Sequence, residues 1–210
     1  MKLFLASYHL EPNGQKLAGL IAENKRIAII PNALDVYPNG QRREESVEKE
    51  KSSLTGIGLV PEELDLRTYF GKPKELETKL SEFGSVWVLG GNTFVLRRAY
   101  KEAGLDNWLQ DYRGDKAFVY AGYSAGVCIL SPSLKGLETV DKPNIVPDGY
   151  NAQVIWDGIG LIDFAFCPHY MSNHPESEAV NSEVEYYQRH GVKYRTLHDG
   201  EVIIMDSETK

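Results

Sequence analysis

A lone serine lies at the junction between a strand-like stretch and a helix-like stretch. The residues KAFVY (116–120) are rich in aromatic and aliphatic side chains, and the motif GYSAG, centred on Ser124, follows them closely. Small residues two positions before and after a serine allow a sharp turn that projects the hydroxyl away from a sheet. Gly122 and Gly126 occupy those positions. The pattern predicts a nucleophilic serine, although an ordinary tight turn would need the same glycines.

A serine nucleophile requires a base, usually a histidine, to take its proton. His169 directly follows DFAFCP (163–168), so we expect it at the C-terminal end of a strand, where ligand crevices form in parallel sheets. We therefore predict that His169 is the base. The other four histidines follow the first strand, lie in a polar loop that could line the cleft, end a helix, or face solvent: His9, His174, His190 and His198.

The third member of such a relay is a carboxylate that holds the histidine in one tautomer. Asp199 precedes Gly200 between two strand-like runs, and this pair predicts a hairpin turn. Asp141, in the loop after the serine motif, is the alternative. We favour Asp199 because a rigid strand end positions an orienting carboxylate better than a long loop does. An Asp-Gly pair is, however, also a routine turn sequence.

A second glycine-rich strand end occurs in VWVLGGNTF. Gly90 and Gly91 would let backbone N–H groups approach a substrate, and Asn92 or Thr93 would cap the following helix. The helix after Ser124 would direct its N-terminus, with partial positive charge, at the place where an oxyanion develops. Two glycine-rich strand ends in one sheet indicate a shared site.

The elements that must position these residues alternate between apolar runs and helical patterns, which is typical of parallel βαβ units. Most runs are continuously apolar, as central strands covered on both faces should be. The expected strands are 2–8, 26–31, 63–69, 85–90, 116–120 and 163–168, and the expected helices are 14–24, 42–56, 73–83, 93–104, 105–112 and 176–190. We predict an α/β fold in a single domain, 1–210, with a doubly wound, mostly parallel sheet, helices on both faces and a C-terminal hairpin.

Composition excludes several classes of protein. The net charge of −7 argues against a nucleic-acid surface, and the mixed charges of 42–51 indicate a solvated helix face. Only two cysteines occur, Cys128 and Cys167, both in apolar surroundings, so we expect buried thiols rather than disulfides. No targeting segment or membrane span is evident, which makes the cytoplasm the expected location.

The sequence gives no sign of a cofactor or a metal. The histidines are scattered without the paired spacing of a zinc site, and neither a P-loop nor a dinucleotide fingerprint is present. The irregular segment 131–160 mixes Pro, Gly, Asp and Asn with isolated aromatic residues. Segments of this length inside a compact domain are often lids or binding loops, so we expect this one to border the site.

Four motifs together, LGGNTF (89–94), GYSAG (122–126), CPHY (167–170) and HDG (198–200), resemble the peptidase E family of serine peptidases. That family includes the aspartyl dipeptidases and, more distantly, the cyanophycinases. The resemblance implies a fold related to class I glutamine amidotransferases and hydrolysis of short peptides. By position it implies catalytic residues Ser124, His169 and Asp199, and an oxyanion hole formed by the N–H groups of Gly91 and Ala125.

The sequence departs from the aspartyl dipeptidases in two places. The hairpin acid there is a Glu, whereas this chain has the shorter Asp199. An arginine that would pair with an N-terminal aspartate is expected shortly after Pro-His-Tyr, but 173–185 contains no Arg or Lys. The absence of that arginine argues against a preference for N-terminal aspartate.

Two other functions fit the same motifs. An α/β-hydrolase esterase also uses a serine elbow, with the chain order Ser, acid, His, which Asp157 or Asp163 with His190 would satisfy. A binding or stress-response module could keep this fold without turnover. Side-by-side dipeptide and ester assays, and labelling by a fluorophosphonate, separate these from a peptidase.

Overall fold

The computed structural model describes residues 1–21, 23–37 and 40–207. A six-stranded sheet has the order β3-β2-β4-β5-β1-β8. Five strands run parallel and β8 pairs antiparallel with β1. The strands are β1 (Lys2–Ala6), β2 (Arg26–Ile30), β3 (Val60–Glu63), β4 (Ser85–Val88), β5 (Val119–Tyr123) and β8 (Val202–Asp206). The expected mostly parallel sheet is confirmed.

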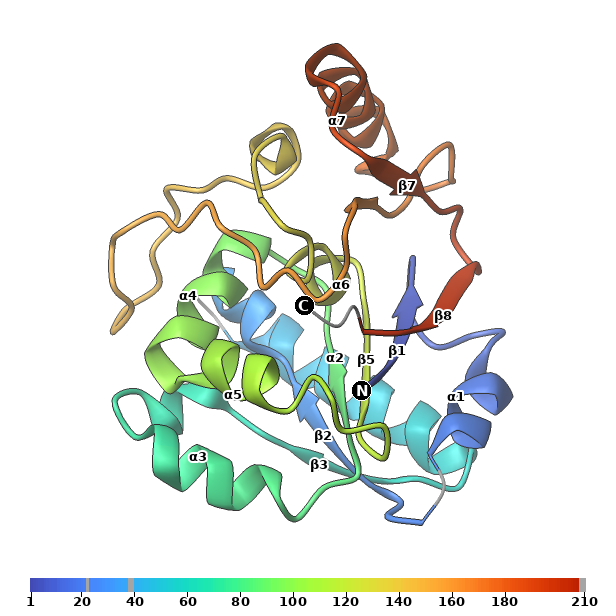
Figure 1. Ribbon diagram of the computed structural model, residues 1–210, viewed down its shortest axis with the longest axis vertical. Coiled ribbons are helices and arrows are strands. Elements are labelled where there is room, and N and C mark those ends of the chain that lie inside the picture. The colour runs from blue at the N-terminus through green and yellow to red at the C-terminus, as the bar shows by residue number, and fades with distance from the viewer. Residues whose placement is uncertain (22, 38–39, 208–210) are drawn as a thin grey trace.

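Helices cover both faces of this sheet (Figure 1). The helices are α1 (Gly14–Leu20), α2 (Gln41–Gly56), α3 (Pro73–Leu80), α4 (Thr93–Ala103), α5 (Leu105–Asp111), α6 (Ala125–Cys128) and α7 (Ser177–His190). Successive β1 side chains point to opposite faces: Leu3 and Leu5 pack in the core shared with α3, α4 and α5, whereas Phe4 packs in the core shared with α1 and α2. This two-sided burial explains why the strands are continuously apolar.

Most expected helices are confirmed with small changes in their ends. Pro73 is the first residue of α3, and Gly104 adopts a left-handed conformation (φ 81°) that ends α4. Asn92 caps α4 by accepting a hydrogen bond from the Val95 N–H at 2.9 Å. The helix expected over 14–24 ends at Leu20, and its residue 22 lies outside the described residues.

The strand expected over 63–69 was wrong. The third strand is β3, which ends at Glu63, and Leu66–Tyr69 is a short 3-10 helix. The Asp65 side chain accepts a hydrogen bond from the Arg67 N–H at 3.0 Å and so turns the chain out of the extended conformation. The alternating pattern of this segment therefore did not belong to a strand.

Two further strands form a small separate sheet. β6 (Ala165–Cys167) pairs in parallel with β7 (Tyr194–Thr196), and α7 packs against it (Figure 1). The strands expected on both sides of the Asp199-Gly200 turn are present as β7 and β8. Each hydrogen-bonds in a different sheet, because β8 joins β1. The turn therefore connects the small sheet to the large one.

The charged run 42–51 forms the first part of α2, but it is not a fully solvated face. Glu50 is only 1% exposed and accepts a hydrogen bond from Trp87 Nε1 at 2.9 Å. Arg43 forms ion pairs with Asp35 and Glu63 at 3.0 and 2.7 Å. One side of α2 is therefore buried against the sheet, and the charged side chains on that side are paired.

No helix in the described part of the chain is both long and apolar enough to cross a membrane.

Candidate active site

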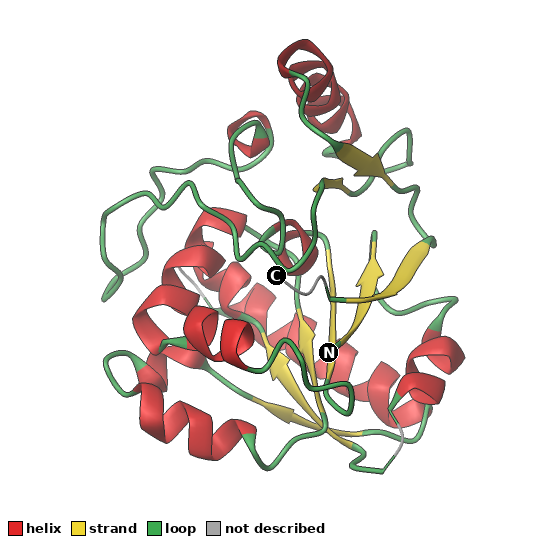
Figure 2. Ribbon diagram, in the orientation of Figure 1, coloured by secondary structure: helices red, strands yellow, loops and turns green. Residues whose placement is uncertain are grey.

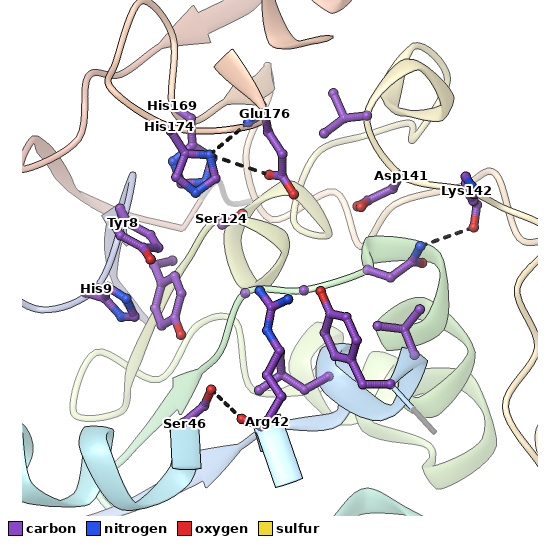
Figure 3. A pocket seen from close by; sticks show the side chains of 18 of the residues that line it. Tyr8, His9, Arg42, Ser46, Ser124, Asp141, Lys142, His169, His174 and Glu176 are labelled. Carbon is purple, nitrogen blue, oxygen red and sulfur yellow. Dashed lines mark hydrogen bonds and ion pairs between the residues drawn. The ribbon is translucent and has the colours of Figure 1, made fainter. Parts of the chain in front are cut away.

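A cavity of about 650 Å³ lies at the C-terminal edge of the large sheet, where ligand crevices of parallel sheets are found. Segments that follow β1, β2, β4, β5 and β6 line it, together with α2 and the loop after α6 (Figure 3). Its walls include Tyr8, Gly91, Ser124, Asp141 and His169. The two glycine-rich strand ends and the histidine predicted from sequence therefore share one site.

Ser124 lies on a sharp turn between β5 and α6 with φ 49° and ψ −121°, a conformation that is strained for a serine. The flanking glycines are required because the turn packs directly on β4. A Cβ atom at Gly122 or Gly126 would lie 2.8 or 2.4 Å from the carbonyl oxygen of Val88. The serine is partly exposed to the cavity, as predicted.

Backbone strain is concentrated around this cavity. Four non-glycine residues among those described have positive φ, and three of them line the cavity: His9, Ser124 and His169. Such conformations cost about 1–3 kcal/mol each and cluster at functional sites. The fold therefore holds these three residues of the site in unfavourable backbone conformations.

His169 and Asp199 form a hydrogen-bonded pair. Nδ1 of His169 lies 2.7 Å from Oδ1 of Asp199. An ionised carboxylate only accepts hydrogen bonds, so Nδ1 carries the proton and Nε2 is the free acceptor of the neutral ring. His169 is only 1% exposed, although it lines the cavity.

Ser7, at the end of β1, joins this pair to the large sheet. Its hydroxyl donates to Asp199 Oδ1 at 2.9 Å and accepts from the backbone N–H of His169 at 2.8 Å. Ser7 is fully buried. Sequence reasoning missed it, and the only signal was a hydroxyl residue at the end of an otherwise apolar strand.

Burial is the main reason why the pKa of His169 falls to about 4. The ring of His174 stacks on it with centroids 3.7 Å apart and planes 8° apart, and a second positive charge there would disfavour protonation further. Hydrogen bonding to Asp199 opposes these effects. His169 is thus neutral, and able to accept a proton, through most of the pH range.

Asp141 lies in the same cavity but has a different partner. Its Oδ2 accepts the backbone N–H of Thr93 at 2.8 Å, at the start of α4. Burial raises the pKa of this carboxyl to about 7. Asp199, and not Asp141, is the carboxylate hydrogen-bonded to His169.

The two expected oxyanion donors belong to separate elements: Gly91 follows β4 and lines the cavity, and Ala125 is the first residue of α6, next to Ser124. Gly91 has φ 141° and lies so close to Ala33 that a Cβ atom would be 2.5 Å from its carbonyl oxygen. Among the described residues, the N–H groups of Gly91 and Ala125 donate no hydrogen bond. The helix after Ser124 has only four residues, so the single Ala125 N–H matters more than a helix dipole.

Several side chains of the site were not singled out from sequence, among them Tyr8, Arg42 and Lys49. Tyr8 packs edge-on against His169 with centroids 5.4 Å apart. Arg42 and Lys49 line the cavity from α2 and belong to the charged run interpreted as solvated. Their spacing of seven residues, two helical turns, was the available signal that both lie on one face of α2.

The remaining histidines are divided as the sequence indicated. His9 and His174 line the cavity, whereas His198 is exposed. His190 ends α7 and its Nδ1 lies 2.8 Å from the Tyr186 carbonyl oxygen. The esterase arrangement is not assembled, because neither His190 nor Asp157 nor Asp163 lines the cavity that contains Ser124. Asp163 instead pairs with Lys193.

A parallel sheet that ends in a strained serine elbow, with a histidine and a carboxylate at the same edge, is the arrangement of the serine hydrolases. The chain belongs to peptidase family S51, whose family model matches residues 4–210. It is a serine-type peptidase of that family that acts on short peptides. The resemblance to peptidase E stated from the motifs is confirmed.

Relatives support the same assignment. An uncharacterized peptidase of Listeria monocytogenes is 33% identical over 166 residues, which are 79% of this chain and 75% of that protein. A Drosophila melanogaster protein named as a probable alpha-aspartyl dipeptidase is 28% identical over 137 residues, 63% of this chain and 54% of that protein. The crystal structure of a protein assigned to peptidase E in Listeria monocytogenes matches with a TM-score of 0.75 at 27% identity, covering 99% of this chain and 98% of that one.

Proposed function

We propose that Ser124, His169 and Asp199 form the catalytic relay of this peptidase, and that the N–H groups of Gly91 and Ala125 bind the oxyanion. The observation that carries the proposal is the 2.7 Å contact of His169 with Asp199 beside the same cavity as the strained Ser124. We further propose that residues 1–210 act as one catalytic domain. The cytoplasm remains the predicted location.

In the proposed reaction Ser124 Oγ attacks the scissile carbonyl while Nε2 of His169 accepts the hydroxyl proton. Asp199 fixes the tautomer and balances the charge of the imidazolium. The two amides stabilise the oxyanion, an effect of roughly 3 kcal/mol for one donor. His169 then protonates the leaving amine, and water releases the acyl group from Ser124 by the same steps in reverse.

The hydroxyl of Ser124 makes no hydrogen bond among the described residues, so we propose that its contact with Nε2 of His169 forms when substrate binds. Catalytic hydrogen bonds are often long or unformed without substrate and tighten in the complex. Partial exposure of Ser124 leaves its hydroxyl free to rotate. The relay is therefore proposed for the substrate complex.

Replacement of Ser124 tests the proposal. We expect Ser124→Ala to lower kcat on a dipeptide panel by at least about 10³-fold and to abolish labelling by a fluorophosphonate. Ser46→Ala is the matched control, because Ser46 lines the same cavity and its hydroxyl is bonded to the Arg42 carbonyl oxygen. Equal turnover of Ser124→Ala and wild type would remove Ser124 from the mechanism.

We also propose that Arg42 binds the carboxylate of the peptide substrate. Its side chain reaches the cavity from α2, opposite His169 and His174, and its guanidinium lies 4.2 Å from the centroid of the Tyr37 ring (Figure 3). A guanidinium supported by an aromatic face is well suited to a carboxylate. Arg42 thus provides a cation for the C-terminal carboxylate, which is a different role from that of the arginine expected within 173–185.

We expect Arg42→Gln to raise KM for dipeptides by about tenfold while kcat changes little, because a ground-state ion pair is lost. Lys51→Gln is the control, since Lys51 is on the same helix and pairs with Glu48. A matched peptide amide, which lacks the carboxylate, should be insensitive to Arg42→Gln. Equal losses on acid and amide would argue against carboxylate recognition.

A further inference from the structure

Two imidazoles and a carboxylate meet at the rim of the cavity. One ring nitrogen each of His169 and His174 and a carboxylate oxygen of Glu176 all lie within 4.8 Å of one another (Figure 3). Two histidines and one carboxylate are a ligand set that Zn²⁺ accepts. We propose that these three residues form a site for a divalent cation of the zinc type, whose binding inhibits the enzyme. The inhibition, though not the binding, rests on the proposed function.

His169 is already prepared as a ligand. Its Nδ1 is bonded to Asp199 at 2.7 Å, which leaves the lone pair on Nε2 for the cavity. Histidines that bind metals almost always donate their other ring N–H to a carboxylate or carbonyl, which fixes the ring and raises its basicity. The pair that suits proton transfer therefore also suits a metal.

The second pair of donors is close to the required spacing. Nδ1 of His174 lies 4.0 Å from Oε2 of Glu176. Bonds of about 2.1 Å at a tetrahedral angle place two ligand atoms about 3.4 Å apart. These two atoms are thus slightly farther apart than one ion requires, and closing the gap also requires the His174 ring to turn.

The segment that carries both donors is anchored at its ends. The Asp199 N–H donates to Ser172 Oγ at 2.9 Å, and the Ser172 N–H donates to Ser177 Oγ at 3.2 Å. His174 currently stacks on His169 and accepts the Glu176 N–H at 3.2 Å, so it must turn to bind. The Glu176 side chain is 44% exposed and free to follow.

The charges around the cavity balance, so affinity would come from the ligands rather than from a general field. Three cationic and three anionic side chains line it: Arg42, Lys49, Lys142, Glu45, Asp141 and Glu176. A metal on Nε2 of His169 takes the lone pair that would accept the Ser124 proton. Binding and proton transfer are therefore mutually exclusive.

Calorimetric titration of the full chain with zinc chloride at near-neutral pH tests the site. We expect one ion per chain for wild type, and binding weaker by at least about tenfold in Glu176→Gln and in His174→Gln. The controls are His198→Gln and Glu178→Gln, which change exposed residues outside the triplet. If the controls weaken binding as much as the two site variants, or the site variants bind like wild type, the site is overturned.

The inhibition is measured separately. Zinc should inhibit dipeptide hydrolysis by wild type at the concentration that fills the calorimetric site, and a chelator should restore the rate. With each protein measured relative to its own rate in chelator, Glu176→Gln should require at least about tenfold more zinc for half-maximal inhibition. A chain that binds zinc but does not hydrolyse peptides refutes the proposed function and keeps the site. Normal hydrolysis that zinc inhibits equally in wild type and Glu176→Gln refutes the inhibition.

Discussion

The two halves of the candidate site come from different layers of the molecule. The serine elbow and Gly91 follow β5 and β4, central strands with buried residues throughout. His169 and Asp199 follow β6 and β7, the strands of the small outer sheet. Figure 2 shows that the segments connecting this outer part to the rest are mostly loops, with a short 3-10 helix at Leu137–Thr139. The proposed nucleophile is thus held by the core, and the proposed base is held by a peripheral unit.

Because the two halves of the site belong to different layers, their alignment depends on the contacts that join these layers. Ser7 bonds both to the His169 N–H and to Asp199, and the Ser7 N–H donates to the Glu201 carbonyl oxygen at 3.1 Å. Because Ser7 belongs to the end of β1, it fixes the outer pair relative to the strand beside β5. We therefore expect this buried hydroxyl to contribute to the alignment of the proposed base and nucleophile.

The largest expected effect distinguishes Asp199 from Asp141 as the carboxylate that orients His169. Asp199→Asn keeps the shape but favours the wrong tautomer of His169, and we expect kcat to fall by about 10³–10⁴-fold. Asp141→Asn, which leaves the His169 pair intact, should cost at most about tenfold. Steady-state kinetics on one dipeptide compares them. A larger fall in kcat for Asp141→Asn than for Asp199→Asn would show that Asp141, and not Asp199, orients His169.

A smaller effect is expected at the joint itself. Ser7→Ala should lower kcat by about tenfold or more, because small misplacements of catalytic groups are costly, and should destabilise the fold by about 1–3 kcal/mol. Ser131→Ala is the control: Ser131 is also buried and accepts the Phe166 N–H at 3.2 Å, away from the relay. Denaturant unfolding and kcat should change together for Ser7, whereas for Ser131 only stability should change. Equal kcat in both variants would show that Ser7 has no positioning role.

The smallest effect concerns pH. Burial, with the nearby His174 ring, lowers the His169 pKa to about 4, so the neutral base persists well below the usual 6.5. The acid limb of kcat/KM should therefore lie near pH 4, and His174→Gln should move it upward by removing one unfavourable charge. Rate profiles of both proteins provide the measurement. A wild-type limb near 6.5 would contradict the description of His169 as strongly desolvated.

The sequence predicted the central layer more accurately than the outer one. Continuous apolar runs identify β1, β2 and β4 because both faces are buried, and the glycines around Ser124 have an evident steric reason. The expected strand 116–120 was shifted, since β5 continues to Tyr123. Apolar runs and glycine positions were sufficient to predict those parts of the structure whose geometry depends on residues close together in the sequence.

The outer layer depends on contacts between distant residues, which pattern does not show. The separate pairing of β7 and β8 follows from long-range hydrogen bonds, and so does the position of Ser7. The sequence did not predict that Arg42 and Lys49 face the cavity, because the same charge pattern occurs on solvated helices. His174 and Glu176 approach His169 after a turn in which the Ser172 N–H donates to the His169 carbonyl oxygen.

The two thiols of the chain give a practical consequence. Cys128 and Cys167 are buried and unpaired, and burial raises the pKa of both thiols, so neither forms a reactive thiolate at neutral pH. An electrophile applied to the folded protein would therefore meet no competing sulfur nucleophile. Activity-based reagents that usually report a mixture of serine and cysteine adducts would, in this protein, yield a single interpretable mass shift.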